Sequence, residues 1–127
     1  METTVLYAGL LGLLHLVLTM RVIRGRQTHA INLGHGNNTE MERRIRGHAN
    51  FVEYVPLILL LMLALESTGA ASGLLHGIGI ILVIARALHG YALAYTENWV
   101  QGRFYGTLLT LIVLAVASLA AVYQGLI

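Results

Sequence analysis

Polar and charged side chains recur at helical spacing inside otherwise apolar sequence. Arg46, Asn50 and Glu53 follow one another at i, i+4 and i+7, which places all three within about one-sixth of a helix circumference. Arg86 and His89 stand at i and i+3 further along the chain. A charge in the middle of a membrane span costs roughly 2.5–3.5 kcal/mol on insertion scales. We therefore expect these side chains to line a polar pocket that faces the helix bundle or a subunit interface.

Arginine exceeds carboxylate in this set of residues. Glu53 alone cannot neutralise Arg46, Arg86 and Arg103, the last of which opens the final apolar stretch. A surplus of buried positive charge favours an anionic ligand, and the planar guanidinium binds carboxylates in bidentate fashion. The alternative is purely structural: Arg46 and Glu53 neutralise each other and lock their helix to its neighbours.

The composition indicates that these residues are set in a membrane. The chain has 127 residues, of which 57% are hydrophobic and 11% charged, whereas about 25% are charged in soluble proteins. The sequence contains no cysteine, lysine or aspartate, which excludes cysteine metal sites, Schiff-base lysines and Ser-His-Asp triads. We expect no metal site, and a formal charge of +2 is too small to indicate nucleic-acid binding.

Four apolar stretches predict four transmembrane helices, at about residues 3–23, 41–66, 73–95 and 103–124. A helix crosses a bilayer with about 20 residues, and only helices or closed barrels satisfy the backbone in lipid. Short second and third connections predict antiparallel neighbours. The expected architecture is an all-α, up-down-up-down four-helix bundle that forms one domain over residues 1–127. Pro56 is expected to kink the second helix, and the first connection, 25–40, to be irregular and mobile.

The arginines predict the orientation of the chain in the membrane. Six of the eight flank the first connection, Arg103 borders the third, and neither the second connection nor either terminus has one. The positive-inside rule then places the first and third connections in the cytoplasm and both termini on the non-cytoplasmic side.

Residues 42–56, ERRIRGHANFVEYVP, resemble the signature of the membrane-associated proteins in eicosanoid and glutathione metabolism, the MAPEG family. The family pattern is E-R-x-x-R-x-x-x-N-x-x-E-Y-x-P, and every fixed position is filled here. Chain length, four spans and an arginine-rich first connection extend the resemblance over the whole chain. The short connections resemble a bacterial member, so the bacterial inner membrane is the expected location.

The resemblance implies a homotrimer that binds glutathione as co-substrate between neighbouring subunits, near the cytoplasmic face. Carried over by position, Arg46 would pair with a glutathione carboxylate and Asn50 would hydrogen-bond the peptide. Glu53 would take the α-ammonium, Tyr54 would contribute a hydroxyl, and His48 would also contact the tripeptide.

The resemblance also assigns residues outside the second helix. Arg86 and His89 look like the family's R-x-x-[YH] motif, whose residues contact glutathione from the adjacent subunit. Arg103 resembles the arginine that activates the thiol in catalytic relatives. Arg24 is a further candidate, because an arginine at this helix end can reach the glutathione site in relatives; it can equally be a topology determinant only.

One position departs from the family pattern. Glutathione-active relatives often place a tyrosine four residues after the [YH] position, where this chain has Leu93. Tyr91 points about 160° away on the helix, so we interpret it as a packing or interface residue, and one glutathione contact is absent.

Three functions follow from these observations. The first is a membrane glutathione transferase or peroxidase, in which a thiolate stabilised by Arg103 attacks an apolar electrophile that enters from the lipid, as in detoxification. The second is a non-catalytic protein of the same fold that binds glutathione or a lipid-like ligand, which Leu93 favours. The third, a small multidrug transporter, needs a carboxylate in the first span, and this span has none.

A few residues have less specific expectations. His15 and His76 lie on apolar spans and are expected to be hydrogen-bonded interior residues rather than haem ligands. Small-residue packing is expected at Gly73, Gly77 and Gly79. Glu66 and Glu97 are expected to be solvated helix ends.

Overall fold

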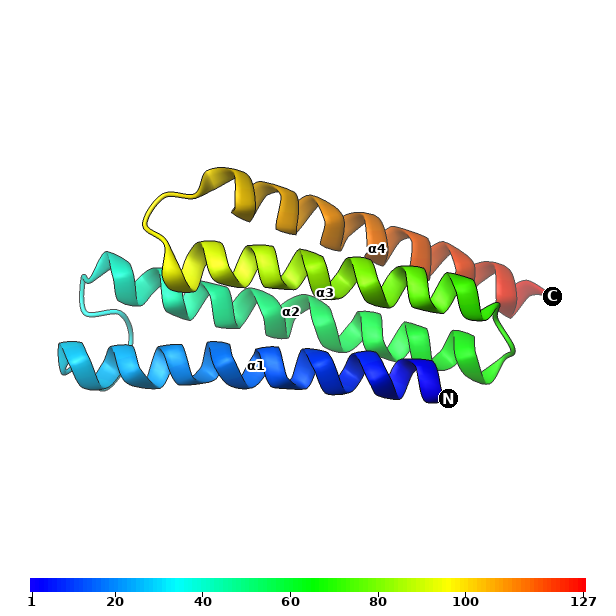
Figure 1. The fold of residues 1–127 in the computed structure, drawn as a ribbon, viewed down its shortest axis with the longest axis horizontal. Coiled ribbons are helices and arrows are strands. Elements are labelled where there is room, and N and C mark those ends of the chain that lie inside the picture. The colour runs from blue at the N-terminus through cyan, green and yellow to red at the C-terminus, as the bar shows by residue number, and fades with distance from the viewer.

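Four long helices account for nearly all of the chain. The computed structural model describes all 127 residues and contains four helices and no strands: α1 (Glu2–His29), α2 (Thr39–Ser67), α3 (Ser72–Tyr95) and α4 (Val100–Leu126). They run up-down-up-down, as Figure 1 shows. Each is long and apolar enough to cross a bilayer. The predicted all-α membrane architecture is confirmed.

The end of α1 lies further along the chain than predicted. The helix was expected to end near residue 23 and continues to His29. It ends where Ala30 adopts a left-handed conformation with φ of 52°, and the Ile31 N–H donates to the Arg26 carbonyl at 3.0 Å, a common helix-ending arrangement. The first part of the expected loop 25–40 is therefore helical, because this hydrogen-bonded stop comes six residues after the apolar run ends.

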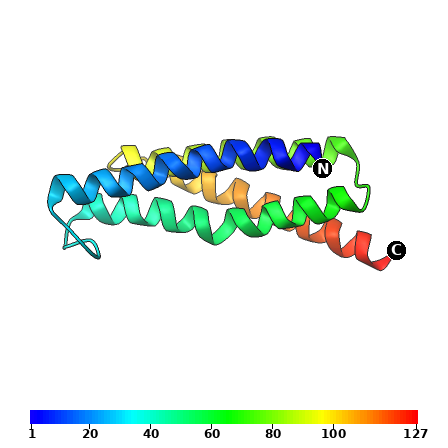
Figure 2. The same ribbon diagram turned by 90° about the horizontal axis from the view of Figure 1, so that it is seen from below.

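Helices α2 and α4 begin earlier than predicted. The Asn38 side chain accepts a hydrogen bond from the Met41 N–H at 2.9 Å and so caps α2, which starts at Thr39. Helix α4 starts at Val100 rather than residue 103. Helix α2 continues through Pro56 without a break, and its ribbon bends about midway along its length (Figure 2).

The bundle has a central pair and two edges. Helices α2 and α3 each contact all the other helices, whereas α1 and α4 make no contact with each other. Figure 1 shows α1 and α4 on opposite sides of this pair. The core lies between the helices and includes Leu11, Leu18, Ile58, Met62 and Leu82.

Two glycines allow close approach of helices. A Cβ atom on Gly79 would lie 2.3 Å from the Tyr7 ring of α1, and one on Gly106 would lie 2.8 Å from a main-chain carbonyl oxygen of α3. Small residues let helices pack closely in membranes. A Cβ on Gly73 or Gly77 would meet nothing within 4 Å, so within the chain the expected small-residue packing is found at Gly79 and not at the other two.

The end of the bundle that holds the N-terminus contains a capping contact that the sequence did not predict. Glu66 was expected to be a solvated helix end. Its carboxylate instead accepts hydrogen bonds from the N–H groups of Thr3 and Thr4, each at 2.9 Å. These are unpaired donors of the first turn of α1, so Glu66 ties α1 to the end of α2. Nearby, the Tyr7 hydroxyl lies 2.8 Å from His76 Nδ1.

Large apolar side chains are exposed on every helix of the chain. Examples are Leu13, Leu60, Ile84 and Leu119. Exposed apolar surface of this extent marks a protein whose sides are covered by something other than water. Such faces suit contact with membrane lipid.

Candidate functional site

A polar cavity of about 440 Å³ opens between α2, α3 and α4. Eight of its nine lining residues are polar or charged: Thr39, Glu42, Arg43, Arg46, Asn50, His89, Arg103 and Thr107; the ninth is Leu93. They belong to the first half of α2, the second half of α3 and the start of α4. These segments meet at the end of the bundle that carries the first and third connections (Figure 1). The volume is within the range of about 300–1,000 Å³ typical of ligand sites.

The periodicity of α2 presents one face to this cavity. Thr39, Arg43, Arg46 and Asn50 follow at intervals of four, three and four residues, so they project from the same side of the helix. Helix α2 begins at Thr39, directly after the Asn38 cap. The face is thus built from the first three turns of α2.

Two glycines let the helices around the cavity approach one another closely. A Cβ on Gly47 would lie 3.2 Å from the Leu93 Cβ, so α2 and α3 approach closely on one side. Gly106 allows a similarly close approach of α3 and α4, because a Cβ atom on it would lie 2.7 Å from the His89 Cβ. The polar side chains therefore meet in a narrow space between three backbones.

The lining carries an excess of positive charge. Three guanidinium groups, from Arg43, Arg46 and Arg103, face a single lining carboxylate, Glu42. Arg46 Nη2 also lies 3.6 Å from the Glu53 carboxylate, and the two side chains are 54% and 52% exposed. This pair is present as the structural alternative supposed, but both members belong to α2, so it locks α2 to no neighbour. The cavity is suited to an anion.

Two polar atoms of the lining residues are buried and make no hydrogen bond. They are Arg43 Nε, a donor, and Asn50 Oδ1, an acceptor. A buried polar group without a partner costs about 1–3 kcal/mol.

The arrangement of α2 agrees with the comparison with known proteins. The MAPEG family profile matches residues 4–123. The chain belongs to the MAPEG family. It is 33% identical over 115 residues to the inner membrane protein YecN of Escherichia coli strain K12, an alignment that covers 90% of this chain and 88% of that protein. YecN of Escherichia coli O6:H1, strain CFT073, matches with the same values.

The structure brings four of the residues predicted from the MAPEG signature and its neighbours into one cavity. They are Arg46, Asn50, His89 and Arg103. Arg86 lies behind the cavity wall, since its side chain is fully buried and lines none of the cavity. Glu53 lies outside the lining, although it contacts Arg46.

The other predicted residues lie away from this cavity. The His48 ring faces α1, with its centroid 5.0 Å from that of His15. Tyr54 is half-buried and packs against the hydrophobic core. Arg24 is exposed on α1, which does not contact α4. Within one MAPEG protomer, none of these three side chains reaches the cavity.

Sequence reasoning missed several lining residues. Arg43 and Glu42 belong to the signature but have no predicted role, and Thr39 and Thr107 lie outside it. The spacing held a signal, because Thr39 and Arg43 continue the face of Arg46 and Asn50 towards the N-terminus, and Thr107 follows Arg103 by four residues.

The departure at Leu93 falls inside the cavity. Leu93 is buried and is the apolar residue of the lining. Tyr91 points outwards, as its spacing predicted: it is 54% exposed and stacks on Tyr95 with a centroid separation of 5.6 Å. No hydroxyl replaces the tyrosine that glutathione-active relatives often have at this position.

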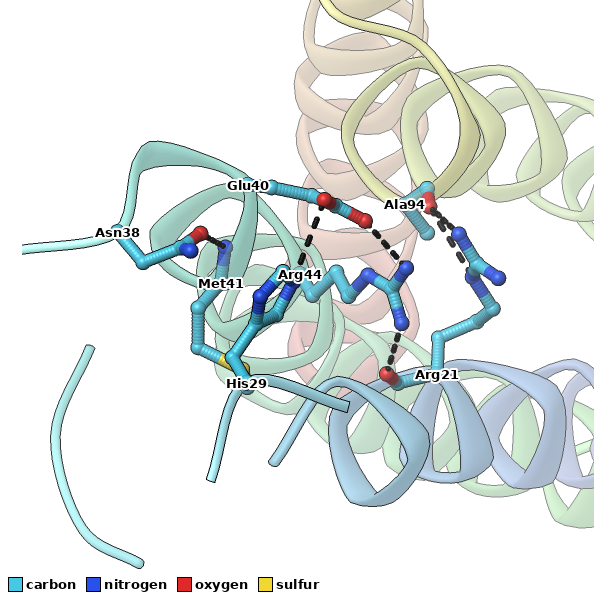
Figure 3. Close-up of polar contacts among 7 residues, drawn as sticks. All are labelled: Arg21, His29, Asn38, Glu40, Met41, Arg44 and Ala94. Atoms are coloured by element: carbon cyan, nitrogen blue, oxygen red, sulfur yellow. Dashed lines mark hydrogen bonds and ion pairs between the residues drawn. The ribbon is translucent and has the colours of Figure 1, made fainter. Parts of the chain in front are cut away.

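A second group of arginines lies at the same end of the bundle and has a different arrangement. Figure 3 shows Arg21 reaching the Ala94 carbonyl at the end of α3, with Nη2 at 2.6 Å and Nε at 3.1 Å. Arg44 Nη1 donates to the Arg21 carbonyl at 2.9 Å, and Arg44 Nη2 pairs with Glu40. His29 Nε2 lies 3.3 Å from the same carboxylate. This bracing network, made by Arg21, His29, Glu40, Arg44 and the Ala94 carbonyl, joins α1, α2 and α3.

Proposed function

We propose that this MAPEG protein is a membrane-embedded glutathione transferase or peroxidase. Glutathione binds in the cavity as a thiolate, which attacks an apolar electrophile that enters from the bilayer. The observation that carries the proposal is the combination, in one cavity, of three guanidinium groups with a single lining carboxylate.

The groups around the cavity complement those of glutathione, which has two carboxylates, one ammonium, peptide groups and a thiol. Arg43 and Arg46 would bind carboxylates through their guanidinium forks. Glu53 is 3.6 Å from Arg46, so a bound amino-acid end would meet an anion for its ammonium beside a cation for its carboxylate. Asn50 Oδ1 would accept from a peptide N–H.

Arg103 is the residue that would activate the thiol. A free thiol has a pKa of about 8.5 and is mostly protonated at neutral pH, and a neighbouring cation favours the thiolate. Each unit by which the pKa falls corresponds to about 1.4 kcal/mol. Arg103 enters the cavity from α4, opposite the arginines of α2, so the carboxylates and the thiol of one ligand would meet different cations.

The assembly that goes with this function is a homotrimer with both termini on the non-cytoplasmic side. Helices α1 and α4 do not contact each other, and all four helices expose apolar side chains, which supports further packing between copies. Arg24, exposed on α1, would reach the cavity of a neighbouring subunit in such an assembly. The cavity then lies near the cytoplasmic face, where glutathione is supplied.

The experiment that tests the proposal follows the thiolate directly. Purified protein in detergent is titrated with glutathione, binding is measured by calorimetry, and thiolate formation is measured by ultraviolet absorbance. The same titration is run on Arg103→Ala and on Arg26→Gln. Arg26 is the matched control, because it lies at the same end of the bundle, lines none of the cavity, and hydrogen-bonds the Gly34 carbonyl of the first connection.

We expect wild type and Arg26→Gln to bind glutathione and to form thiolate, and Arg103→Ala to bind glutathione as the thiol. If the wild type forms thiolate, the next experiment is to screen apolar electrophiles for turnover. If wild type does not bind glutathione, the proposal is wrong and the signature in α2 serves the fold alone.

A second candidate is a binding protein of the same fold that performs no chemistry. The observation that favours it is Leu93, which puts a methyl-bearing side chain in the cavity where glutathione-active relatives often have a hydroxyl. The same titration separates the two candidates, because a binding protein would hold glutathione as the thiol in the wild type also.

A further inference from the structure

Arg86 is a cation buried without a carboxylate. Its side chain is 0% exposed in the middle of α3, and no carboxylate of the chain lies within ion-pair distance of it, since the four ion pairs involve other residues. Its guanidinium contacts two neutral groups: Nη1 donates to Thr110 Oγ1 at 3.4 Å, and Nη2 lies 3.4 Å from His89 Nδ1. The Arg86 guanidinium also lies over the Phe51 ring, with Cζ 5.7 Å from the ring centroid.

The direction of these contacts follows from the groups involved. A guanidinium can only donate hydrogen bonds. The Thr110 hydroxyl donates to the Gly106 carbonyl at 2.7 Å, so its lone pairs face Arg86. A hydrogen bond between Nη2 and His89 Nδ1, which lie 3.4 Å apart, likewise requires a lone pair on Nδ1. In a neutral imidazole one ring nitrogen accepts and the other donates, so the proton of His89 is then on Nε2.

We propose that Arg86 is a positioning residue that holds His89 in its Nε2–H tautomer and thereby places a hydrogen-bond donor in the cavity wall. His89 lines the cavity, and Nε2 is the ring nitrogen that makes no hydrogen bond within the chain. It meets an acceptor of the bound ligand: a carboxylate, peptide carbonyl or thiolate. The proposal rests on the proposed function for the identity of that ligand as glutathione, but the tautomer is a property of the protein alone.

The close packing of α3 and α4 makes this arrangement specific. A Cβ on Gly106 would lie 2.8 Å from both the Ala85 carbonyl oxygen and the His89 backbone nitrogen, so only glycine lets the two helices approach this far. The same approach carries Thr110, one turn after Gly106, to Arg86. Arg86 thus reaches one acceptor on α4 and one on its own helix, and it does so without reaching the ligand itself.

The first test reads the tautomer without any ligand. Protein labelled with ¹⁵N in its histidine rings is placed in detergent micelles, and two-bond nitrogen–proton correlations are recorded for wild type, Arg86→Met and Arg26→Gln, with His89→Gln to assign the signal. We expect the Nε2–H form of His89 in wild type and Arg26→Gln. In Arg86→Met, which keeps an unbranched, flexible side chain but removes the donors, we expect the Nδ1–H form to gain population.

The second test uses two amides as mimics of the two ring nitrogens. The terminal amide of His89→Gln can place an N–H near the position of Nε2, whereas that of His89→Asn reaches only the position of Nδ1. We expect His89→Gln to bind glutathione with nearly the wild-type affinity, and His89→Asn to bind about tenfold more weakly, as for the loss of one hydrogen bond.

The outcomes separate this proposal from the function of the site. An Nδ1–H form or a doubly protonated ring in wild type overturns the proposal, and so does an Arg86→Met spectrum identical to wild type. If Arg86→Met does not fold, the wild-type spectrum still overturns the proposal where it shows an Nδ1–H or doubly protonated ring. If the tautomer is Nε2–H and responds to Arg86 while glutathione fails to bind, the positioning role stands and the proposed ligand is wrong.

Discussion

Two sets of arginines lie at one end of this MAPEG protein, and their partners differ. The bracing network directs Arg21 and Arg44 to main-chain carbonyls and to Glu40. The cavity arginines, Arg43, Arg46 and Arg103, make no hydrogen bond to another helix. Guanidinium groups whose donors are paired within the chain stabilise the fold, and those whose donors are unpaired are available to a ligand.

Neighbouring residues in the sequence belong to different sets. Arg43 and Arg44 are consecutive, and consecutive residues of a helix point about 100° apart. Arg44 therefore faces α1, where it is 8% exposed and donates to the Arg21 carbonyl, while Arg43 lines the cavity between α2, α3 and α4. Arg21 meets the Ala94 carbonyl in the last turn of α3, where a helix leaves its carbonyls without internal partners. Position on the helix, rather than residue type, decides the role of each arginine.

The largest effect that this comparison predicts is on glutathione affinity. Arg46→Ala removes a charged hydrogen-bond partner of a carboxylate, which contributes about 1.5–3 kcal/mol, so we expect affinity to fall by about 10- to 100-fold. The free energy of unfolding should hardly change, because Arg46 is half-exposed and its pair with Glu53 lies along one helix.

Isothermal calorimetry and denaturant unfolding in the same detergent measure both quantities. Arg46→Lys is the matched variant: it keeps the charge but loses the fork, so its affinity should lie between those of wild type and Arg46→Ala. Unchanged glutathione affinity in Arg46→Ala would show that this arginine does not bind the ligand.

The next effect is on stability and concerns the neighbour pair. Arg44→Ala leaves the Glu40 carboxylate and the Arg21 carbonyl without their donor, and a hydrogen bond to a charged group contributes about 1.5–3 kcal/mol. We expect the free energy of unfolding to fall by about 2 kcal/mol. Arg43→Ala should change it by less than about 0.5 kcal/mol and should weaken glutathione binding instead. Equal losses of stability in the two variants would remove the distinction between them.

The sequence predicted the scaffold well for physical reasons that are local. Long apolar runs fix four spans, and the signature of α2 fixes the family. Spacing alone predicted that Arg46 and Asn50 share one face of α2 and that Tyr91 points away from the cavity, as the structure shows. These features depend on one helix at a time.

Features that depend on two helices at once were harder to predict. Whether Arg86 lines the cavity or lies behind it depends on how closely α3 approaches α4, which Gly106 decides. His48 belongs to the signature but faces His15 on α1. Glu66 looks like a solvated end until α1 places its first turn against it. A single sequence does not state which helix faces are neighbours.

A smaller effect concerns the start of α2, the helix that carries arginines of both sets, and leaves the charge unchanged. Asn38→Ala removes the side-chain acceptor of the Met41 N–H at the start of α2 (Figure 3), and loss of such a cap costs about 1 kcal/mol. We expect that loss in denaturant unfolding. Asn38→Ser keeps a capping oxygen and should recover most of it. A loss of glutathione affinity larger than tenfold would show that the cap also shapes the cavity face of α2.

The smallest predicted effect concerns the aromatic contact of the network. The Arg21 guanidinium lies over the Tyr95 ring, with Cζ 4.1 Å from the centroid, and Tyr95 is half-exposed. Such a cation–π contact contributes about 0.5–1 kcal/mol at an exposed site. Tyr95→Leu should therefore lower the free energy of unfolding by that amount, whereas Tyr95→Phe keeps the ring and should match wild type. Because Arg21 also holds the Ala94 carbonyl through two hydrogen bonds, Tyr95→Leu should leave the network in place and glutathione affinity unchanged. A fall in affinity would mean instead that the ring, and not the carbonyl, holds α1 against α3 beside the cavity.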